Sequence, residues 1–246
     1  MSVRVVALGD SLSCGEGVGL RLDPALTWPA LLAAALPGGG LTSLARPGAR
    51  VAEVLAHQLP VVATLRPDLV TVLAGLNDVV RADPDPDRVA RELRHTVAGV
   101  VATGATVLLC TLPEPGLHLP LPPALRRVVR RRAAVVDAVV RAAGEQHGCV
   151  EVLDLAGLDG LQRRRAWEVD RVHPNASGHA MVAGLAAAAL RRRGWEVGAV
   201  APRTLPVAPG ALREARWLLR DGLPWLVRHS GSVVVPAARL SLRPSV

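Results

Sequence analysis

Three short stretches of this sequence hold residues that could together perform nucleophilic chemistry. Ser11 follows one apolar run, Asn77 follows another, and Asp170 precedes His173 by three residues late in the chain. A carboxylate can hold an imidazole in the tautomer that takes the proton of a serine hydroxyl, and amide N–H groups can donate to a developing oxyanion. Each stretch alone also fits an ordinary turn, helix cap or surface pair. Together and in this order, they predict a site for acyl chemistry.

The predicted reaction gives each of these residues one role. The Ser11 hydroxyl attacks an acyl carbonyl, His173 accepts its proton through Nε2, and Asp170 holds His173. The Ser11 backbone N–H and the Asn77 side chain donate hydrogen bonds to the tetrahedral oxyanion, and water then releases the acyl group. We expect Asp10, directly before the serine, to be structural.

The elements that must position these residues alternate between short apolar runs and longer amphipathic stretches. The runs rich in Val and Leu span residues 3–8, 41–45, 69–74, 106–110 and 150–153. The helical patterns cover residues 26–36, 49–65, 87–103, 122–146 and 176–193, with Asp87 as an N-cap. Strands that are buried on both faces and separated by helices indicate a parallel sheet. We therefore predict a doubly wound, flavodoxin-like α/β fold: three α/β/α layers, a five-stranded parallel sheet, and a ligand site at its carboxyl edge.

A change in composition near residue 198 divides the chain. We predict an α/β domain over residues 1–197 and an extension over residues 198–246, with a Pro-rich linker at 201–210 and a helix candidate at 211–229. This helix candidate is basic, carries Trp217 and Trp225, and is interrupted by Gly222 and Pro224. Its composition fits docking on its own domain, covering of the active-site mouth, a dimer contact or peripheral contact with a membrane surface. The sequence leaves these alternatives and the oligomeric state open.

The composition narrows the range of partners. The 246 residues contain 29 arginines, no lysine and 21 acidic residues, which gives a formal charge of +8. The arginines are spread over several helical patterns and no Phe or Tyr is present to stack on bases, so we expect no nucleic-acid partner. The three cysteines lack metal-type spacing, so we expect neither a metal nor another cofactor. Without a signal-peptide pattern or an apolar run of about 18 residues, we expect a cytoplasmic protein.

The motifs resemble those of the SGNH (GDSL-type) hydrolase family over residues 3–193. The first block matches residues 9–17 with Ser11 at the nucleophile position, the third matches residues 75–78 with Asn77 as oxyanion donor, and the fifth matches residues 170–174. The only other asparagine, Asn175, follows the fifth block. The second block is matched by Gly48. The resemblance implies that the backbone N–H of Gly48 is a further oxyanion donor. The resemblance implies a lipase-like serine esterase or acylhydrolase that forms an acyl-enzyme on Ser11.

Three functions remain open from the sequence. The first is hydrolysis of a small-molecule carboxylic ester, the second is transfer from the same acyl-enzyme to an alcohol or amine, and the third is a catalytically silent binding protein. The intact set of predicted catalytic residues argues against the third. We expect the substrate to contact loops at residues 12–24, 76–86, 111–122 and 156–169, where Leu158, Leu161 and Trp167 would add an apolar wall.

Overall fold

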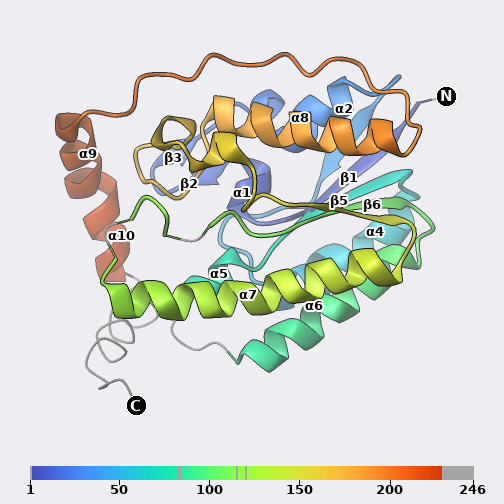
Figure 1. Ribbon diagram of the computed structural model, residues 1–246, viewed down its shortest axis with the longest axis horizontal. Coiled ribbons are helices and arrows are strands. Elements are labelled where there is room, and N and C mark those ends of the chain that lie inside the picture. The colour runs from blue at the N-terminus through green and yellow to red at the C-terminus, as the bar shows by residue number, and fades with distance from the viewer. Residues whose placement is uncertain (1, 82–84, 115, 120, 229–246) are drawn as a thin grey trace.

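A five-stranded parallel sheet forms the centre of the molecule. The computed structural model describes residues 2–81, 85–114, 116–119 and 121–228 (Figure 1). The strands of this sheet are β1 (Arg4–Gly9), β4 (Gly40–Ser43), β5 (Leu69–Leu73), β6 (Thr106–Cys110) and β7 (Val150–Leu153). They lie in the order β4-β1-β5-β6-β7 and every neighbouring pair is parallel. Relative to the chain this order is 2-1-3-4-5, which confirms the predicted flavodoxin-like winding.

Helices cover both faces of the sheet and complete the three layers. On one face, α2 (Trp28–Ala34) packs against α8 (Ala176–Arg192); on the other, α6 (Pro86–Val101) packs against α7 (Pro123–Gln146) and α4 (Leu59–Leu65) (Figure 1). The short helices α3 (Val51–Glu53) and α5 (Leu76–Val80) lie beside α6 and α7 respectively. The helix predicted over 49–65 is α3 and α4 joined by a π-helical turn, Val54–Gln58.

The remaining short elements lie in the connections. They are α1 (Ser11–Cys14), the antiparallel hairpin of β2 (Glu16–Gly17) and β3 (Leu20–Arg21), and three 3-10 turns at Pro24–Leu26, Asp159–Gln162 and Arg164–Ala166. The N-cap of α6 is Asp85, whose side chain accepts from Arg88 N, so the prediction of Asp87 is wrong. Pro86 accounts for this shift of two residues, because proline suits the first helical position and the residue before it, Asp85, is then the cap.

The central strands are buried on both faces, as a parallel sheet between two helical layers requires. All five residues of β5 are buried, and so are five of the six residues of β1. Val and Leu supply nearly all of this surface, since the chain contains no Phe or Tyr. Branched aliphatic side chains suit this pleated, two-sided environment.

A close backbone contact fixes where β1 ends. A Cβ on Gly9 would lie 2.0 Å from the carbonyl oxygen of Leu73 on β5, and Gly9 has φ +137°, which L side chains rarely adopt. The buried Gln58 amide also accepts from Gly9 N (2.8 Å) and donates to Gly9 O (2.9 Å). The chain therefore leaves β1 at a defined point and in a defined direction, immediately before Asp10 and Ser11.

The C-terminal extension carries the expected helices. The helix α9 (Ala211–Trp217), a π-helical turn (Leu218–Gly222) and α10 (Leu223–Arg228) follow one another and lie at one end of the molecule, beyond the start of α7 (Figure 1). The connection from α8 to α9 runs across the outside of the α2–α8 layer (Figure 1). The last residues of the sequence, whose composition fits either a strand-like or an irregular conformation, lie outside the described residues.

We expect Gly9→Ala to destabilise the protein by roughly 3 kcal/mol or more, because the new methyl group overlaps the Leu73 carbonyl and the backbone conformation is unfavourable. Urea unfolding followed by circular dichroism would measure the change. The matched control is Gly184→Ala in α8, where the added Cβ meets no atom within 4 Å. This control should gain about 0.5–1 kcal/mol from higher helix propensity. Equal effects of the two changes would contradict the steric account.

Candidate active site

The ends of β1 and β5 place two of the predicted residues side by side. Asp10 is the N-cap of α1 and accepts from Leu12 N, so Ser11 occupies the first position of a four-residue helix at the carboxyl edge of the sheet. Asn77 lies in α5, directly after β5. Because β1 and β5 flank the point where the winding reverses direction, their carboxyl ends border the crevice in which doubly wound folds bind ligands.

His173 joins Ser11 to Asp170 in one line of hydrogen bonds. The distance from His173 Nε2 to Ser11 Oγ is 2.8 Å, and the distance from His173 Nδ1 to Asp170 Oδ2 is 2.5 Å. With Nδ1 protonated and donating to the carboxylate, Nε2 is free to accept from the serine hydroxyl. The other oxygen of Asp170 accepts from the backbone N–H groups of Val172 and His173, at 3.0 Å each.

The hydrogen bonds of Asp170 keep it ionised although it is buried. Burial alone would raise the pKa of this carboxyl, but the hydrogen bond from His173 and the two backbone donors outweigh it and hold the pKa below its usual value. The carboxylate is therefore charged near neutral pH, as holding an imidazole requires.

The loop that carries Asp170 and His173 is a tight turn between two strand-like segments. Trp167 and Pro174 form an isolated antiparallel bridge, and Glu168 N donates to His173 O at 2.8 Å. Between them, Arg171 adopts a left-handed conformation with φ +63°, which is unfavourable for a residue with a Cβ. This turn brings the carboxylate of Asp170 and the imidazole of His173 onto the same side of the loop.

Gly17 packs directly against the His173–Asp170 pair. A Cβ at this position would lie 2.7 Å from His173 Nδ1 and 3.0 Å from Asp170 Oδ2. The β2–β3 hairpin thus covers one side of the imidazole and leaves no space for a side chain. Sequence analysis placed Gly17 within a motif but did not identify this contact.

The predicted oxyanion donors also lie beside Ser11. Asn77 Nδ2 donates to Asp10 Oδ2 (3.2 Å) and to the carbonyl of Ala49 (3.1 Å), and Gly48 lines the same cavity as Ser11 and Asn77. Both amide hydrogens of Asn77 therefore have protein acceptors, which orient the group toward the Gly48–Ala49 loop. An oxyanion would have to share one of these hydrogens.

Two buried aspartates hold this part of the site. Asp10 behaves as the expected structural residue, because it caps α1 and binds Asn77. Burial raises its pKa to about 7, although the N–H of Leu12 and the nearby His173 oppose this shift. Asp78 accepts from Val51 N at 2.9 Å and from Arg50 Nε at 3.3 Å, and so anchors the segment that follows the Gly48 loop.

A cavity of about 550 Å³ opens over Ser11 and His173. As expected, loops 12–24 and 76–86 line it, through residues such as Val18 and Val80. The prediction for loops 111–122 and 156–169 is wrong, because none of their described residues lines this cavity. Leu161 and Trp167 are instead 2% and 5% exposed in the core, where Trp167 Nε1 donates to Leu161 O, and the half-buried Leu158 packs on the same core.

Two further segments line the cavity. One is the segment 47–53, of which the sequence had pointed to Gly48 alone, and the other is the C-terminal extension, for which covering of the active-site mouth was one of the open alternatives. The extension contributes Arg220, Asp221, Trp225 and Arg228. Glu16 also lines the cavity, and its carboxylate lies 3.6 Å from Arg21 Nε.

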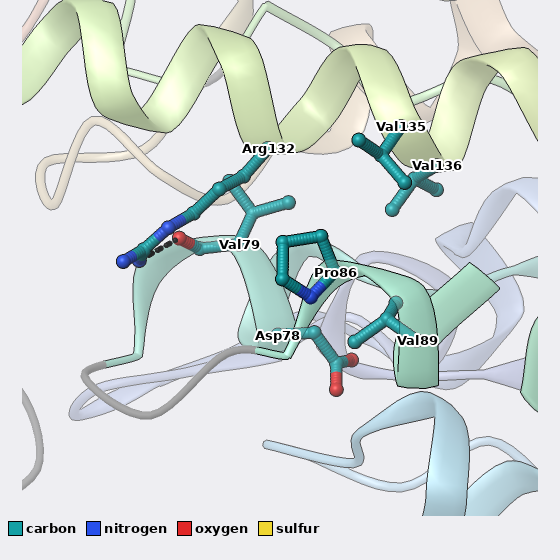
Figure 2. Close-up of a pocket in the computed structure, with 7 residues that line it drawn as sticks. All are labelled: Asp78, Val79, Pro86, Val89, Arg132, Val135 and Val136. Atoms are coloured by element: carbon teal, nitrogen blue, oxygen red, sulfur yellow. Dashed lines mark hydrogen bonds between the residues drawn. The ribbon is translucent and has the colours of Figure 1, made fainter.

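Other polar groups near the site have structural partners. His179 is 1% exposed, its Nδ1 accepts from Trp28 N at 3.1 Å, and burial lowers its pKa to about 3, so it is neutral. A second cavity of only about 10 Å³ lies between α5, α6 and α7 (Figure 2). There Arg132 donates to the carbonyls of Val79 and Arg81 and secures the C-terminal end of the Asn77 helix.

The structure thus has a doubly wound α/β fold in which a serine, a histidine and an aspartate form one hydrogen-bonded line at the carboxyl edge. A family model described as "GDSL-like Lipase/Acylhydrolase family" matches residues 7–181. The chain belongs to this family. Its members are esterases and acylhydrolases, which supports ester hydrolysis as the general activity of this chain. The match ends before the C-terminal extension.

Solved structures of hydrolases share the fold. A lipase/acylhydrolase from Enterococcus faecalis has a TM-score of 0.61 and 17% identity, with 82% of this chain and 99% of that chain covered. The psychrotrophic esterase EstA from Pseudoalteromonas sp. has a TM-score of 0.59 and 18% identity, covering 77% and 97% respectively. LAE5, an alpha/beta hydrolase from the Lake Arreo metagenome, has a TM-score of 0.60 and 25% identity, covering 76% and 94%. No curated protein matches this sequence.

The described residues include neither a membrane-spanning helix nor a cluster of metal ligands. None of the helices placed by the structure is both long and apolar enough to cross a membrane. Across residues 2–228, leaving aside the gaps given above, no group of three His, Cys, Asp or Glu side chains is arranged to hold a metal ion.

We expect Gly17→Ala to lower ester turnover by roughly 10²-fold or more, because the methyl group displaces the imidazole from Ser11 and small misplacements at a reacting centre are costly. Turnover of p-nitrophenyl acetate and the thermal midpoint would be measured together. Gly148→Ala, where an added Cβ has open space, is the matched control and should leave turnover unchanged. Full turnover in Gly17→Ala would contradict the described packing.

The raised pKa of Asp10 predicts a pH dependence of stability. The folded state holds the Asp10 proton up to about pH 7, whereas the unfolded chain releases it near 3.8, so stability falls as pH rises between these values. Asp10 alone contributes a slope of up to about 1.4 kcal/mol per pH unit. Urea unfolding of wild type and Asp10→Asn from pH 5 to 8 would measure it. The free energy of unfolding should fall more steeply with pH in wild type than in Asp10→Asn, by the contribution of Asp10. Identical slopes in the two proteins would contradict a raised pKa of Asp10.

Proposed function

We propose that this protein is a serine esterase that cleaves carboxylic esters through an acyl-enzyme on Ser11. The observation that carries the proposal is the continuous line Asp170–His173–Ser11, with distances of 2.5 Å and 2.8 Å between the bonded atoms. Aspartate, imidazole and hydroxyl in this connectivity are what activation of a serine by a general base requires.

The first half of the reaction forms the acyl-enzyme. His173 Nε2 takes the hydroxyl proton as Ser11 Oγ bonds to the ester carbonyl carbon, and the carbonyl oxygen becomes an oxyanion. The imidazolium that results is stabilised by the ionised Asp170. When the tetrahedral intermediate collapses, His173 returns the proton to the alkoxide leaving group, and the alcohol departs.

The second half repeats these steps with water. His173 removes a proton from water as the oxygen attacks the acyl carbon, and the second tetrahedral intermediate expels Ser11, which regains its proton from His173. In both halves the backbone N–H groups of Ser11 and Gly48 and the side chain of Asn77 are the proposed oxyanion donors. Removing one such donor typically lowers turnover by about 10²–10³-fold.

The cavity favours compact, polar esters over long acyl chains. Its volume of about 550 Å³ is in the range of small-molecule sites. Charged and amide side chains outnumber the aliphatic ones among its lining residues. A long hydrocarbon chain would bury these polar groups without hydrogen-bond partners, which is unfavourable.

We expect a fluorophosphonate probe to label wild type and not Ser11→Ala, with turnover of p-nitrophenyl acetate and butyrate lost in parallel by at least about 10³-fold. The Pseudoalteromonas esterase in the comparison is described as inhibited by monoethylphosphonate, so this reagent class suits a protein of similar fold. The matched control is Ser13→Ala: Ser13 is 1% exposed and its Oγ has no partner among the described residues. This control should keep both labelling and turnover.

Two outcomes would count against the proposal. One is the absence of labelling in folded wild-type protein, and the other is labelling that persists in Ser11→Ala. Adding an alcohol acceptor separates hydrolysis from acyl transfer, because a hydrolase continues to release free acid whereas a transferase diverts the acyl group to the acceptor.

A further inference from the structure

The C-terminal segment of residues 211–228 is held against the two loops that flank His173. Glu214 accepts from Arg164 Nη2 at 2.8 Å and from Arg171 Nη2 at 2.5 Å, and Arg171 is the residue next to Asp170. These ion-pair side chains are between 20% and 34% exposed, so solvent screens them only in part. On the other side, Trp217 Nε1 donates to the carbonyl of Val18 in the β2–β3 hairpin at 2.9 Å.

The connection that leads to this segment is also bound to the α/β body. Arg165 donates to the carbonyls of Leu205 (3.0 Å) and Pro206 (2.7 Å), and Ser177 Oγ donates to Thr204 O at 2.9 Å. Side chains of the body thus bind both the backbone of the connection and Glu214 of α9. The extension has a defined place in the fold, beside the candidate active site.

This placement makes the segment one wall of the cavity. Arg220, Asp221, Trp225 and Arg228 line the same space as Ser11, and Arg81 lines it from the α/β body. The guanidinium of Arg81 points toward the Gly48–Ala49 loop, since its Nη2 lies 3.9 Å from where a Cβ on Gly48 would be. A cationic group therefore lies close to the expected reaction centre.

Two of the three acidic side chains of the cavity have polar partners within the protein. Glu16 lies 3.6 Å from Arg21, and Glu53 accepts from the backbone N–H of Arg50 at 2.8 Å. The Asp221 carboxyl packs onto Gly19 so closely that a Cβ there would lie 2.5 Å from its Cγ. The Asp221 carboxyl therefore lies against the β2–β3 hairpin.

The three arginines of the cavity differ from these carboxylates. Within the described part of the chain, Arg81, Arg220 and Arg228 form no ion pair with any carboxylate. Arg228 Nε donates to the carbonyl of Pro224. Guanidinium groups that form no ion pair, gathered around one cavity, suit an anionic group because they bind carboxylates and phosphates through charge-assisted hydrogen bonds.

We propose that the substrate of this site is an ester that also carries a negatively charged group, which Arg81 and the C-terminal residues Arg220 and Arg228 bind. This inference rests on the proposed esterase function and names its substrate class. The extension then acts as a specificity element: it places two of the three cations, and Glu214 and Trp217 hold it over Ser11. An uncharged ester reaches the same nucleophile without this binding contribution.

The test compares esters that differ in charge at one position. The first pair is para-acetoxybenzoate and its methyl ester, which differ in the alcohol part, and the second is mono-p-nitrophenyl adipate and p-nitrophenyl hexanoate, which differ in the acyl part. We expect wild type to have at least about tenfold higher kcat/KM for the anionic member of one pair, as one charge-assisted contact provides. The pair that shows this preference identifies which part of the ester carries the charge.

Variants then assign the preference to the arginines. In Arg220→Gln/Arg228→Gln the anionic-to-neutral ratio of kcat/KM should fall about tenfold, mainly through KM, and Arg81→Gln should lower the same ratio. The matched control is Arg216→Gln, an exposed arginine of α9 that does not line the cavity, and it should keep the wild-type ratio. In the double variant Arg220→Glu/Arg228→Glu, kcat/KM should become higher for a cationic ester, acetylcholine, than for the anionic esters. Loss of folding could not produce such a reversal of preference.

The possible failures are distinguishable. If fluorophosphonate does not label Ser11, the esterase proposal itself fails. If Ser11 is labelled and neutral esters are hydrolysed, but the wild-type ratio in both pairs is near one or is unchanged in the arginine variants, the esterase proposal stands and the anionic-substrate inference is overturned.

Discussion

The hydrogen bond between Ser11 Oγ and His173 Nε2 joins two residues that are 162 positions apart, and it forms only if the whole sheet is wound correctly. Ser11 stands after the first strand, whereas His173 stands in the loop before α8, the helix that follows the last strand of the sheet. Both reach the same edge because all five strands are parallel, which directs every strand–helix connection to the carboxyl side. Misplacement of either loop by about 1 Å would disrupt this contact, so positional precision is the main demand on the fold.

That precision comes from buried polar contacts near each strand end. The amide of Gln58 bonds both backbone groups of Gly9, Asp10 caps α1 and orients Asn77, and Asp78 fixes the segment after Gly48. Two residues after His173, Asn175 caps α8 through Ser177 N and Gly178 N. The low dielectric around such groups strengthens their hydrogen bonds and makes any unsatisfied alternative unfavourable. Apolar packing stabilises the sheet, and these polar contacts fix the conformation of the loops at its carboxyl edge.

Much of this arrangement was predictable from the sequence because the relevant signals are local. Apolar runs of four to six residues identified all five strands, and the motifs around Ser11, Asn77 and Asp170–His173 indicated which strand ends carry chemistry. Both asparagines of the sequence lie beside predicted catalytic residues. Asn77 donates a hydrogen bond to Asp10, next to Ser11, and Asn175 caps α8 two residues after His173. The assignment of catalytic roles to these residues stays a prediction until the variants are measured.

What sequence analysis missed depends on contacts between segments far apart in the chain. Two such contacts are the close approach of Gly17 to His173 and the hydrogen bonds that Glu214 accepts from Arg164 and Arg171. Neither contact produces a periodic or compositional pattern in the sequence. The apolar wall assigned to Leu161 and Trp167 was wrong because an apolar loop residue can face the core as readily as a cavity, and only the packed structure decides. The alternatives for the C-terminal extension could not be separated for the same reason. Each of them depends on which surface the extension contacts, and only the packed structure shows that surface.

The direction of β1 has a consequence for attaching this protein to a support. Arg4 begins the strand and Ser11 follows its end, so the six residues between them hold the two positions about 20 Å apart on opposite edges of the sheet. The sequence contains no lysine. A single lysine introduced at the amino edge of the sheet would therefore be the only side-chain amine, and amine-directed coupling through it would orient the molecules with the Ser11 cavity facing the solution.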